Sequence, residues 1–354
     1  MQITHAEVTP VELALRQPIR MGMTAEISAI TAIYIRLETR DGRVAWSCTV
    51  AHPDLNGEKP GDTLRACQAG ADLVPDLHPT HIEYSLSRLS AEIASSPAAL
   101  CAFDLLFHDL LGLAAGMPLY RILGGYRRRI QTSVTIPIAS VQESVDLARE
   151  KVRLGFRKLK IKGGLDPEED VRRIQAIHRS LPDIVLRLDA DGGYTVEQAL
   201  DVARALENKL EMLEQPTPAH DLVSLGQATR HSPVPVLADQ SLSGPKSALE
   251  LATHRYADGL SVKMASCGGL NCARQIDAIA RAANLATMVG CLIEPALLIA
   301  AGLSFALSSP NVGYADLDGN LELVNDPSVP GFRLEEGWLI CSDLPGLGCT
   351  VNLN

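Results

Sequence analysis

The sequence lacks the features that mark several large classes of protein. It has no excess of basic residues, since its formal net charge is −10 at pH 7, and this gives no electrostatic basis for binding nucleic acid. No uninterrupted apolar run reaches the roughly 18 residues that a membrane span needs, so no membrane partner is expected. The first ten residues show no basic segment followed by an apolar stretch, so we expect no signal peptide.

The sequence also lacks cysteine motifs and a glycine-rich dinucleotide-binding turn. The eight cysteines form no CxxC pair and no short disulfide framework, which predicts reduced, buried thiols in a cytoplasmic protein; a secreted, disulfide-bonded protein is the alternative. Gly163 and Gly164 do not fit a GxGxxG turn, which argues against an open dinucleotide-binding sheet. The 354 residues suffice for one large core plus a smaller domain.

The middle of the chain repeats a pattern. A short apolar, β-branched run followed by a stretch with helical spacing recurs about every 25 residues, which is the length of a βα unit. Eight such runs are found, at residues 131–136, 157–162, 184–189, 210–214, 235–239, 259–263, 285–290 and 313–316. They predict an α/β fold with a closed (β/α)-barrel over residues 126–321; a doubly wound open sheet is the alternative.

The segments on either side of the repeat differ from it. Residues 1–50 alternate apolar and polar side chains as strands do, with a hairpin turn at Asp41 and Gly42. Residues 80–118 are predicted to be helical, and 98–112 are apolar on most faces, which predicts a buried helix. We therefore predict an α+β domain over residues 1–125, completed by the C-terminal segment 322–354.

Five consecutive predicted strands end in a charged residue. Such a charge is costly to bury unless it is paired or binds a metal, and the C-terminal ends of barrel strands face the active site; for any single one, a residue leaving the core for solvent is the alternative. Lys162 ends the second strand and Lys263 the sixth, which places them on opposite sides of an eight-stranded barrel. The carboxylates on the arc between them are Asp189, Glu214 and Asp239. An all-oxygen ligand set of this kind suits Mg²⁺, one ion per subunit.

Two lysines that face each other across a metal imply a proton transfer. A metal-bound carboxylate can take up the charge left when its α-proton departs, so that one lysine removes the proton and the other returns one to the opposite face. One lysine must then be neutral near pH 7, which requires its pKa to fall from about 10.4 to about 7. Lys160 lies on the same side of its strand as Lys162, and two like charges oppose each other's protonation; a solvated basic edge is the alternative for this run.

At these residues the chain resembles the enolase superfamily, in its muconate-lactonizing branch, over nearly its whole length. The resemblance implies a modified TIM barrel of the (β/α)7β type, a capping domain that closes over its mouth, and a homo-oligomer. The motifs that carry it are KIK at 160–162, LRLDAD at 186–191, LEQP at 213–216, LADQS at 237–241, VKMASCGGL at 262–270 and MPLYRILGGYRRR at 117–129.

One more motif narrows the reaction. Asp316 and Asp318 are similar to the pair that holds the substrate's α-ammonium group in dipeptide epimerases, and two carboxylates in a closed site are unfavourable unless a cation joins them; a simple turn at Asp318 and Gly319 is the alternative. The resemblance thus implies a Mg²⁺-dependent dipeptide epimerase that inverts the α-carbon of the C-terminal residue through an enediolate. N-acylamino acid racemases, o-succinylbenzoate synthases and muconate-type cycloisomerases share the scaffold, and a non-catalytic barrel is a further alternative.

Three positions depart from the family's usual motifs. Asp191 stands where asparagine is usual, Gln240 where glutamate is usual, and Pro295 follows Glu294 where serine or threonine is common. None of these removes a proposed ligand or base, but residues around a metal site tune its affinity and activity. The departures predict an altered specificity.

The choice of substrate side chain is expected to come from two cap loops, near residues 18–27 and 50–58. In Ala-Glu epimerases an arginine in the first loop grips the glutamate, whereas Thr24 stands at the aligned position here. Methionines such as Met23 favour a pocket for an apolar side chain. Glu26 and Asp54 would suit a cationic side chain, which is one alternative. Arg20 would suit an acidic side chain, which is the other. The predicted substrate-binding residues are Asp316, Asp318, Thr135, Met23, Thr24 and Glu294.

Overall fold

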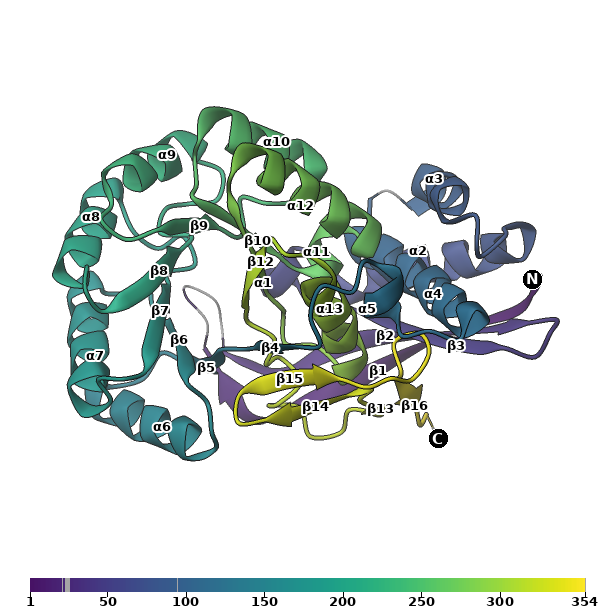
Figure 1. The fold of residues 1–354 in the computed structure, drawn as a ribbon, viewed down its shortest axis with the longest axis horizontal. Helices are drawn as coiled ribbons and strands as arrows, with labels where there is room; N and C mark the ends of the chain where they lie inside the picture. The colour runs from purple at the N-terminus through teal and green to yellow at the C-terminus, as the bar shows by residue number, and fades with distance from the viewer. Residues whose placement is uncertain (21, 23–25, 94, 354) are drawn as a thin grey trace.

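The computed structural model describes residues 1–20, 22, 26–93 and 95–353. Its largest unit is an eight-stranded parallel sheet whose strands are neighbours in chain order (Figure 1). A parallel bridge between Thr132 and Ala315 joins the last strand to the segment just before the first, so the predicted barrel is confirmed. The strands are β5 (Val134–Ile136), β6 (Lys158–Lys162), β7 (Val185–Asp189), β8 (Leu210–Glu214), β9 (Val236–Ala238), β10 (Gly259–Val262), β11 (Ala286–Val289) and β12 (Val312–Ala315).

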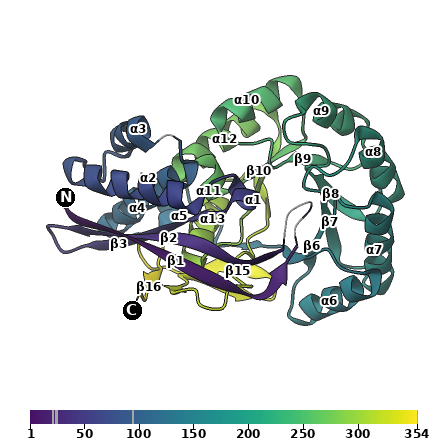
Figure 2. The ribbon, with the colours of Figure 1, turned by 180° about the vertical axis from the view of Figure 1, so that it is seen from behind.

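Helices between the strands cover the outside of the barrel (Figure 1, Figure 2). Their starts are specified locally, because Ser140 and Thr195 form capping boxes and the side chain of Asp166 accepts two backbone N–H groups. No helix follows β12 among the described residues, which is the (β/α)7β order that the resemblance implied. The helices are α6 (Val141–Arg153), α7 (Pro167–Ser180), α8 (Val196–Ala205), α9 (Leu222–His231), α10 (Pro245–His254), α11 (Met264–Cys267), α12 (Leu270–Ala283) and α13 (Ala296–Ser308).

The N-terminal part is an antiparallel sheet with helices on one side, as predicted. The sheet has the order β1 (Ile3–Ile19), β2 (Ile27–Thr39), β3 (Val44–Ala51), and the expected hairpin joins β2 to β3. Helix α4 (Pro97–Ala115) packs on β3. It is long and apolar enough to cross a membrane, but 72% of its most apolar stretch is buried inside the protein, as a core helix is. The remaining helices are α1 (Pro53–Asn56), α2 (Pro60–Leu73), η1 (Val74–Asp76), α3 (Ile82–Ile93) and α5 (Leu119–Ile122).

The C-terminal segment contacts both units. The backbone N–H of Arg16 on β1 donates to the carbonyl of Glu322, and the Tyr34 hydroxyl on β2 donates to Asp326. A three-stranded sheet has the order β14, β15, β4, so the segment also pairs with the chain that enters the barrel. These short strands are β4 (Arg129–Gln131), β13 (Ser328–Val329), β14 (Phe332–Glu335), β15 (Trp338–Cys341) and β16 (Thr350–Val351). The division into 1–125 with 322–354 and 126–321 stays a prediction.

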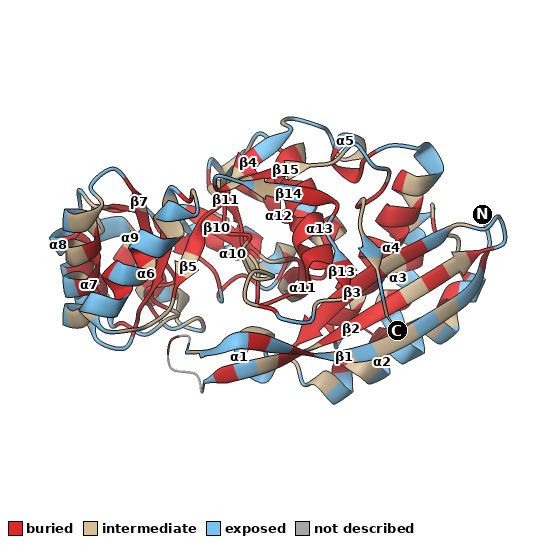
Figure 3. Cartoon of the chain, turned by 90° about the horizontal axis from the view of Figure 1, so that it is seen from below, coloured by how far each residue is buried: buried red, intermediate tan, exposed pale blue. Residues whose placement is uncertain are grey.

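The barrel strands are buried almost throughout, as Figure 3 shows. This is expected of parallel strands that are covered by helices on one face and by one another's side chains on the other. Charged side chains interrupt this apolar interior, and Lys160, Arg187 and Asp189 are each at most 3% exposed. Charges so deeply buried must be paired or must bind a ligand.

Candidate active site

The charged side chains gather at the C-terminal ends of consecutive barrel strands. Each is placed there by its position at the last residues of a strand or directly after it, where the chain leaves the barrel wall. They are Lys160 and Lys162 on β6, Asp189 at the end of β7, Glu214 at the end of β8, Asp239 after β9 and Lys263 after β10. In the strand order, β6 and β10 are separated by three strands on one side. This puts Lys162 and Lys263, which we call the two outer lysines, across the barrel from each other.

Three of these carboxylates form a compact group. Asp189, Glu214 and Asp239 are all buried, and each offers one oxygen such that these oxygens lie within 4.8 Å of one another. Ser261 donates a hydrogen bond of 3.0 Å to one oxygen of Glu214, and the other oxygen lies 2.8 Å from the Lys160 ammonium nitrogen. Burial, together with the charge of Asp189, raises the pKa of Glu214 to about 7. Buried carboxylates this close repel one another unless a cation joins them, so the group fits a hard divalent ion.

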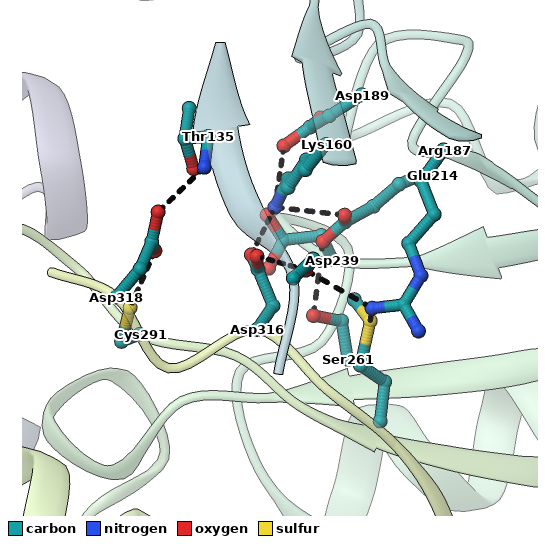
Figure 4. Close-up of polar contacts among 12 residues, drawn as sticks. Thr135, Lys160, Arg187, Asp189, Glu214, Asp239, Ser261, Cys291, Asp316 and Asp318 are labelled. Atoms are coloured by element: carbon teal, nitrogen blue, oxygen red, sulfur yellow. Dashed lines mark hydrogen bonds and ion pairs between the residues drawn. The ribbon is translucent and has the colours of Figure 1, made fainter. Parts of the chain in front are cut away.

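Lys160 places its positive charge between two carboxylates of this group and Asp316 (Figure 4). Its ammonium nitrogen lies 2.9 Å from Asp189, 2.8 Å from Glu214 and 2.7 Å from Asp316. Burial lowers the pKa of Lys160, but the surrounding carboxylates, Asp189 first, outweigh that effect and raise it well above its usual value. Lys160 is therefore a permanently charged group in the protein without bound metal or substrate.

The two outer lysines have different partners. Lys162 Nζ lies 2.8 Å from Asp189 and 2.9 Å from Asp191, and Lys263 Nζ lies 2.6 Å from Asp239. For both, burial lowers the pKa but the carboxylates raise it further, so the net shift is upward. The prediction that one lysine has a lowered pKa is thus wrong for the protein alone. Lys160 does oppose the protonation of Lys162, as predicted, but the carboxylate charges are larger.

Asp191 enters the site although the sequence marked it only as a departure from a motif. Its backbone φ is 45°, and this left-handed turn just after β7 lets the carboxylate return toward Lys162. Gln240 donates a hydrogen bond of 2.9 Å to the same carboxylate. Two acidic residues spaced by one after a barrel strand were the signal in the sequence, but a return of the second one requires a positive φ that the sequence alone does not specify.

A network of buried hydrogen bonds fixes the Asp316 carboxylate. Ser133 donates to one oxygen at 2.6 Å and Lys160 to the other at 2.7 Å. Arg187, inside the barrel, donates to Ser133 at 3.1 Å and to the carbonyl of Ala315 at 2.9 Å. Burial raises the pKa of Asp316, but Lys160 outweighs it, and the net shift is downward. Asp316 is therefore an anion with a fixed orientation.

Asp318 lies beside it with less compensation. It accepts the backbone N–H of Thr135 at 2.6 Å, and the Cys291 thiol lies 3.7 Å from its other oxygen (Figure 4). Burial, followed by the charge of Asp316, raises the pKa of Asp318 to about 6. The two carboxylates together favour the binding of a cation beside them.

A cavity of about 770 Å³ opens onto these groups. It is lined on the barrel side by the three lysines, Asp191, Asp316, Asp318 and Thr135, and on the side of the capping domain by residues of β1 and by Asp54 and Leu55. Such a volume accommodates a small organic molecule. The predicted residues Met23 and Thr24 lie outside the described residues.

Glu294 is the one predicted substrate-binding residue, among those that the structure describes, that does not line the cavity. Its side chain is 1% exposed and accepts the backbone N–H of Leu292 at 3.1 Å. Burial raises its pKa to about 8. Cys291, Leu292 and Ile293 form the cavity wall in its place.

The fold and the site define a barrel protein built for acid–base chemistry beside a divalent cation. Residues 143–354 match the family described as Enolase C-terminal domain-like, and the chain belongs to the enolase superfamily. It is 36% identical to the L-Lys-D/L-Arg epimerase of Methylococcus capsulatus, over 98% of this chain and 99% of that protein. It is 32% identical to the hydrophobic dipeptide epimerase of Enterococcus faecalis, again over 98% and 99%. The crystal structure of the dipeptide epimerase from Enterococcus faecalis V583 with Mg and L-Leu-L-Tyr superposes with a TM-score of 0.96 at 31% identity, covering 99% of this chain and 100% of that one.

Proposed function

We propose that this protein is a Mg²⁺-dependent dipeptide epimerase that inverts the α-carbon of the C-terminal residue. The observation that carries the proposal is the placement of Lys162 and Lys263 across the barrel, with three buried carboxylates between them and an acidic pair at the same cavity. The activities named for similar proteins that match over nearly the whole chain support the reaction class.

The metal is assigned to Asp189, Glu214 and Asp239. Their all-oxygen donor set and their burial fit Mg²⁺. When bound, the ion supplies positive charge beside the substrate carboxylate, and this makes the neighbouring α-proton more acidic. Lys160, fixed among the same carboxylates, adds a second positive charge at that place.

The proton transfer is assigned to Lys162 and Lys263. One lysine, as a neutral amine, takes the α-proton from its face of the substrate, and the other, as an ammonium ion, delivers a proton to the opposite face. Because their roles exchange with the direction of the reaction, both epimers are substrates. Positive charge from the metal and from Lys160 lowers the pKa of the lysine that acts as base.

The acidic pair is assigned to the free ammonium group of the dipeptide. Asp316 and Asp318 line the cavity, and Thr135 fixes Asp318 through its backbone N–H. An N-acylated amino acid has no such charge, and neither does a muconate-type substrate. The acidic pair therefore favours dipeptides over those substrates, and the loss of activity in Asp316→Asn tests this choice.

The charges of the cavity bear on the substrate's side chains. Away from the catalytic groups, four acidic residues and two basic ones line the cavity, and Lys151 is paired with Glu322 at 3.3 Å. The acidic residues are Asp54, Glu150, Glu322 and Glu336, and the basic ones are Arg16 and Lys151. This excess of negative charge favours a dipeptide with a cationic side chain, and the apolar share of the wall keeps apolar dipeptides as the second choice. An acidic side chain would meet repulsion there.

The test is exchange of the α-proton in D₂O with Mg²⁺ and a library of L,L-dipeptides with cationic, apolar and acidic side chains. We expect exchange and epimerisation of at least one cationic or apolar member. Lys162→Ala and Lys263→Ala should each reduce epimerisation by at least about a thousandfold, because loss of a proton donor or acceptor removes its whole contribution, while each retains exchange from one face. Lys246→Ala, an exposed lysine on α10, serves as the control. No exchange with any dipeptide would refute the proposal.

A homo-oligomer and a cytoplasmic location complete the proposal. All eight cysteines are free thiols, which supports a reducing compartment. Light scattering of the purified protein tests the oligomer.

A further inference from the structure

The two outer lysines are held in different ways. Lys263 contacts Asp239, which belongs to the proposed metal-binding group. Lys162 contacts Asp189, which also belongs to that group, and in addition both oxygens of Asp191, each at 2.9 Å. Asp191 lies outside the metal-binding group, so it stays available to Lys162 when Asp189 serves a cation. Among the described residues, no corresponding ion pair with an outside carboxylate is found for Lys263.

Asp191 is itself fixed by several contacts. Gln240 donates to its Oδ1 at 2.9 Å, and its own backbone N–H donates to Asp189 at 3.1 Å. Its positive φ of 45° directs the side chain back over the end of β7. Gly22 of the capping domain packs so closely that a Cβ there would lie 2.9 Å from the Cβ of Asp191. A carboxylate restrained in this way holds its ammonium partner in one place.

We propose that Asp191, oriented by Gln240, is the positioning residue of Lys162, and that it therefore controls proton transfer on one face of the α-carbon only. The proposal rests on the proposed epimerase function. Asp191 does not touch the substrate's reacting carbon in this assignment; it acts by fixing the direction of the Lys162 amine. Gln240 acts one contact further away and through the same carboxylate.

The pair also makes a charge exchange possible. The Gln240 amide donates a hydrogen bond to the Asp191 carboxylate, and both side chains line the same cavity as Lys162. Asp191→Asn removes the charge next to Lys162. In Asp191→Asn/Gln240→Glu the charge returns on the other member of the hydrogen-bonded pair, and part of the lost function should return with it. Gln240→Glu alone places two carboxylates in contact and should disturb Lys162 by repulsion.

The experiment measures α-proton exchange in D₂O separately for the L,L and L,D epimers of one dipeptide substrate, at saturating Mg²⁺. Each epimer presents its proton to a different lysine, and Lys162→Ala identifies the epimer that depends on Lys162. For that epimer we expect Asp191→Asn to slow exchange by about 10–100-fold, as the loss of supporting contacts in metal sites does. Exchange of the opposite epimer should change by less than about threefold. For the same epimer, the double variant should regain at least about a third of the loss in the logarithm of the exchange rate.

Gln240→Ala keeps the test independent of folding, because Gln240 is exposed. It should slow the same epimer by about 3–10-fold. Asp277→Asn, a buried carboxylate that accepts hydrogen bonds from Thr287, Ser309 and Asn311 outside the cavity, is the matched control and should affect both epimers equally or neither. The thermal shift on adding Mg²⁺ checks that each variant keeps its metal site.

The two levels of the proposal fail in different ways. If the wild-type protein exchanges neither epimer of any dipeptide, the epimerase function is wrong. If the wild type exchanges both epimers, but Asp191→Asn and Gln240→Ala leave the ratio of the two rates unchanged, Asp191 is not the positioning residue of Lys162. An equal slowing of both epimers overturns the proposal as well, since a purely structural or metal-related role predicts that result.

Discussion

Among single residues, Asp318 is the carboxyl group whose titration should control substrate binding. Its pKa of about 6, raised by burial and by Asp316, means that it is mostly charged at pH 7 and mostly neutral at pH 5. Only the charged form attracts the ammonium group of a dipeptide. We therefore expect KM to rise as the pH falls through about 6, approaching tenfold per pH unit well below that value. Initial rates between pH 5 and pH 8 measure this.

The matching variant separates Asp318 from other acids. Asp318→Asn should raise KM at pH 7.5 and make it nearly independent of pH over the same range. Asp343→Asn, an exposed carboxylate paired with Arg121 and Arg128, should leave the profile unchanged. An unchanged rise of KM at low pH in Asp318→Asn would assign the effect to another group.

Single residues also show how far the sequence alone could go. The charged strand ends were predictable because a period of about 25 residues fixes where each strand ends, and the barrel then fixes where those ends meet. Asp191 was not, because its role depends on one left-handed backbone turn. Glu294 was proposed for the substrate, but a motif does not state on which side of a loop its side chain lies, and in the structure this side chain is buried and does not line the cavity.

At the level of secondary-structure elements, Asp104 joins the capping domain to the barrel. It lies on α4, and its Oδ2 accepts the backbone N–H groups of Leu270 and Asn271 at the start of α12. A buried carboxylate that caps a helix N-terminus both satisfies these donors and favours the helix dipole. Asp104→Ala should lower the free energy of unfolding by about 2–3 kcal/mol, measured by chemical denaturation. Asp62→Ala, an exposed first-turn acid of α2, is the control; an equal effect of both would contradict the role of Asp104.

The same residue gives a pH dependence of stability. His108 lies 3.1 Å from Asp104, and although burial lowers its pKa, Asp104 outweighs that effect and raises it. A histidine whose pKa is higher in the folded protein stabilises it fully below the unfolded value of about 6.5. That contribution is lost as the pH rises through the folded pKa, and Asp104→Ala should abolish this part of the pH dependence.

The elements themselves were predicted unevenly. The barrel strands and α4 followed from repeated spacing and from an apolar stretch, both of which are local properties of the sequence. The sheet of β4, β14 and β15 did not, because these strands are short and β4 lies far from its partners in the chain. Pairing over such a separation depends on the folded barrel that brings the strands together.

For the whole molecule, the proposed metal should act as a stabiliser of the fold. The three carboxylates lie at the end of, or directly after, three different barrel strands and meet only in the folded chain, so Mg²⁺ binds the native state in preference to the unfolded one. At a concentration one hundred times the dissociation constant, this linkage is worth about 2.7 kcal/mol, which corresponds to a rise in Tm of roughly 4 °C. The rise in Tm should grow between pH 6 and pH 8, because Glu214, with its pKa of about 7, must lose its proton before it binds the ion.

Differential scanning fluorimetry with MgCl₂ against NaCl of equal ionic strength measures this shift in Tm, and addition of EDTA should reverse it together with the activity. Glu214→Gln should lose the shift, whereas Glu211→Gln, on the same strand and paired with Arg187 instead, should keep it; a shift that survives in Glu214→Gln would place the ion elsewhere.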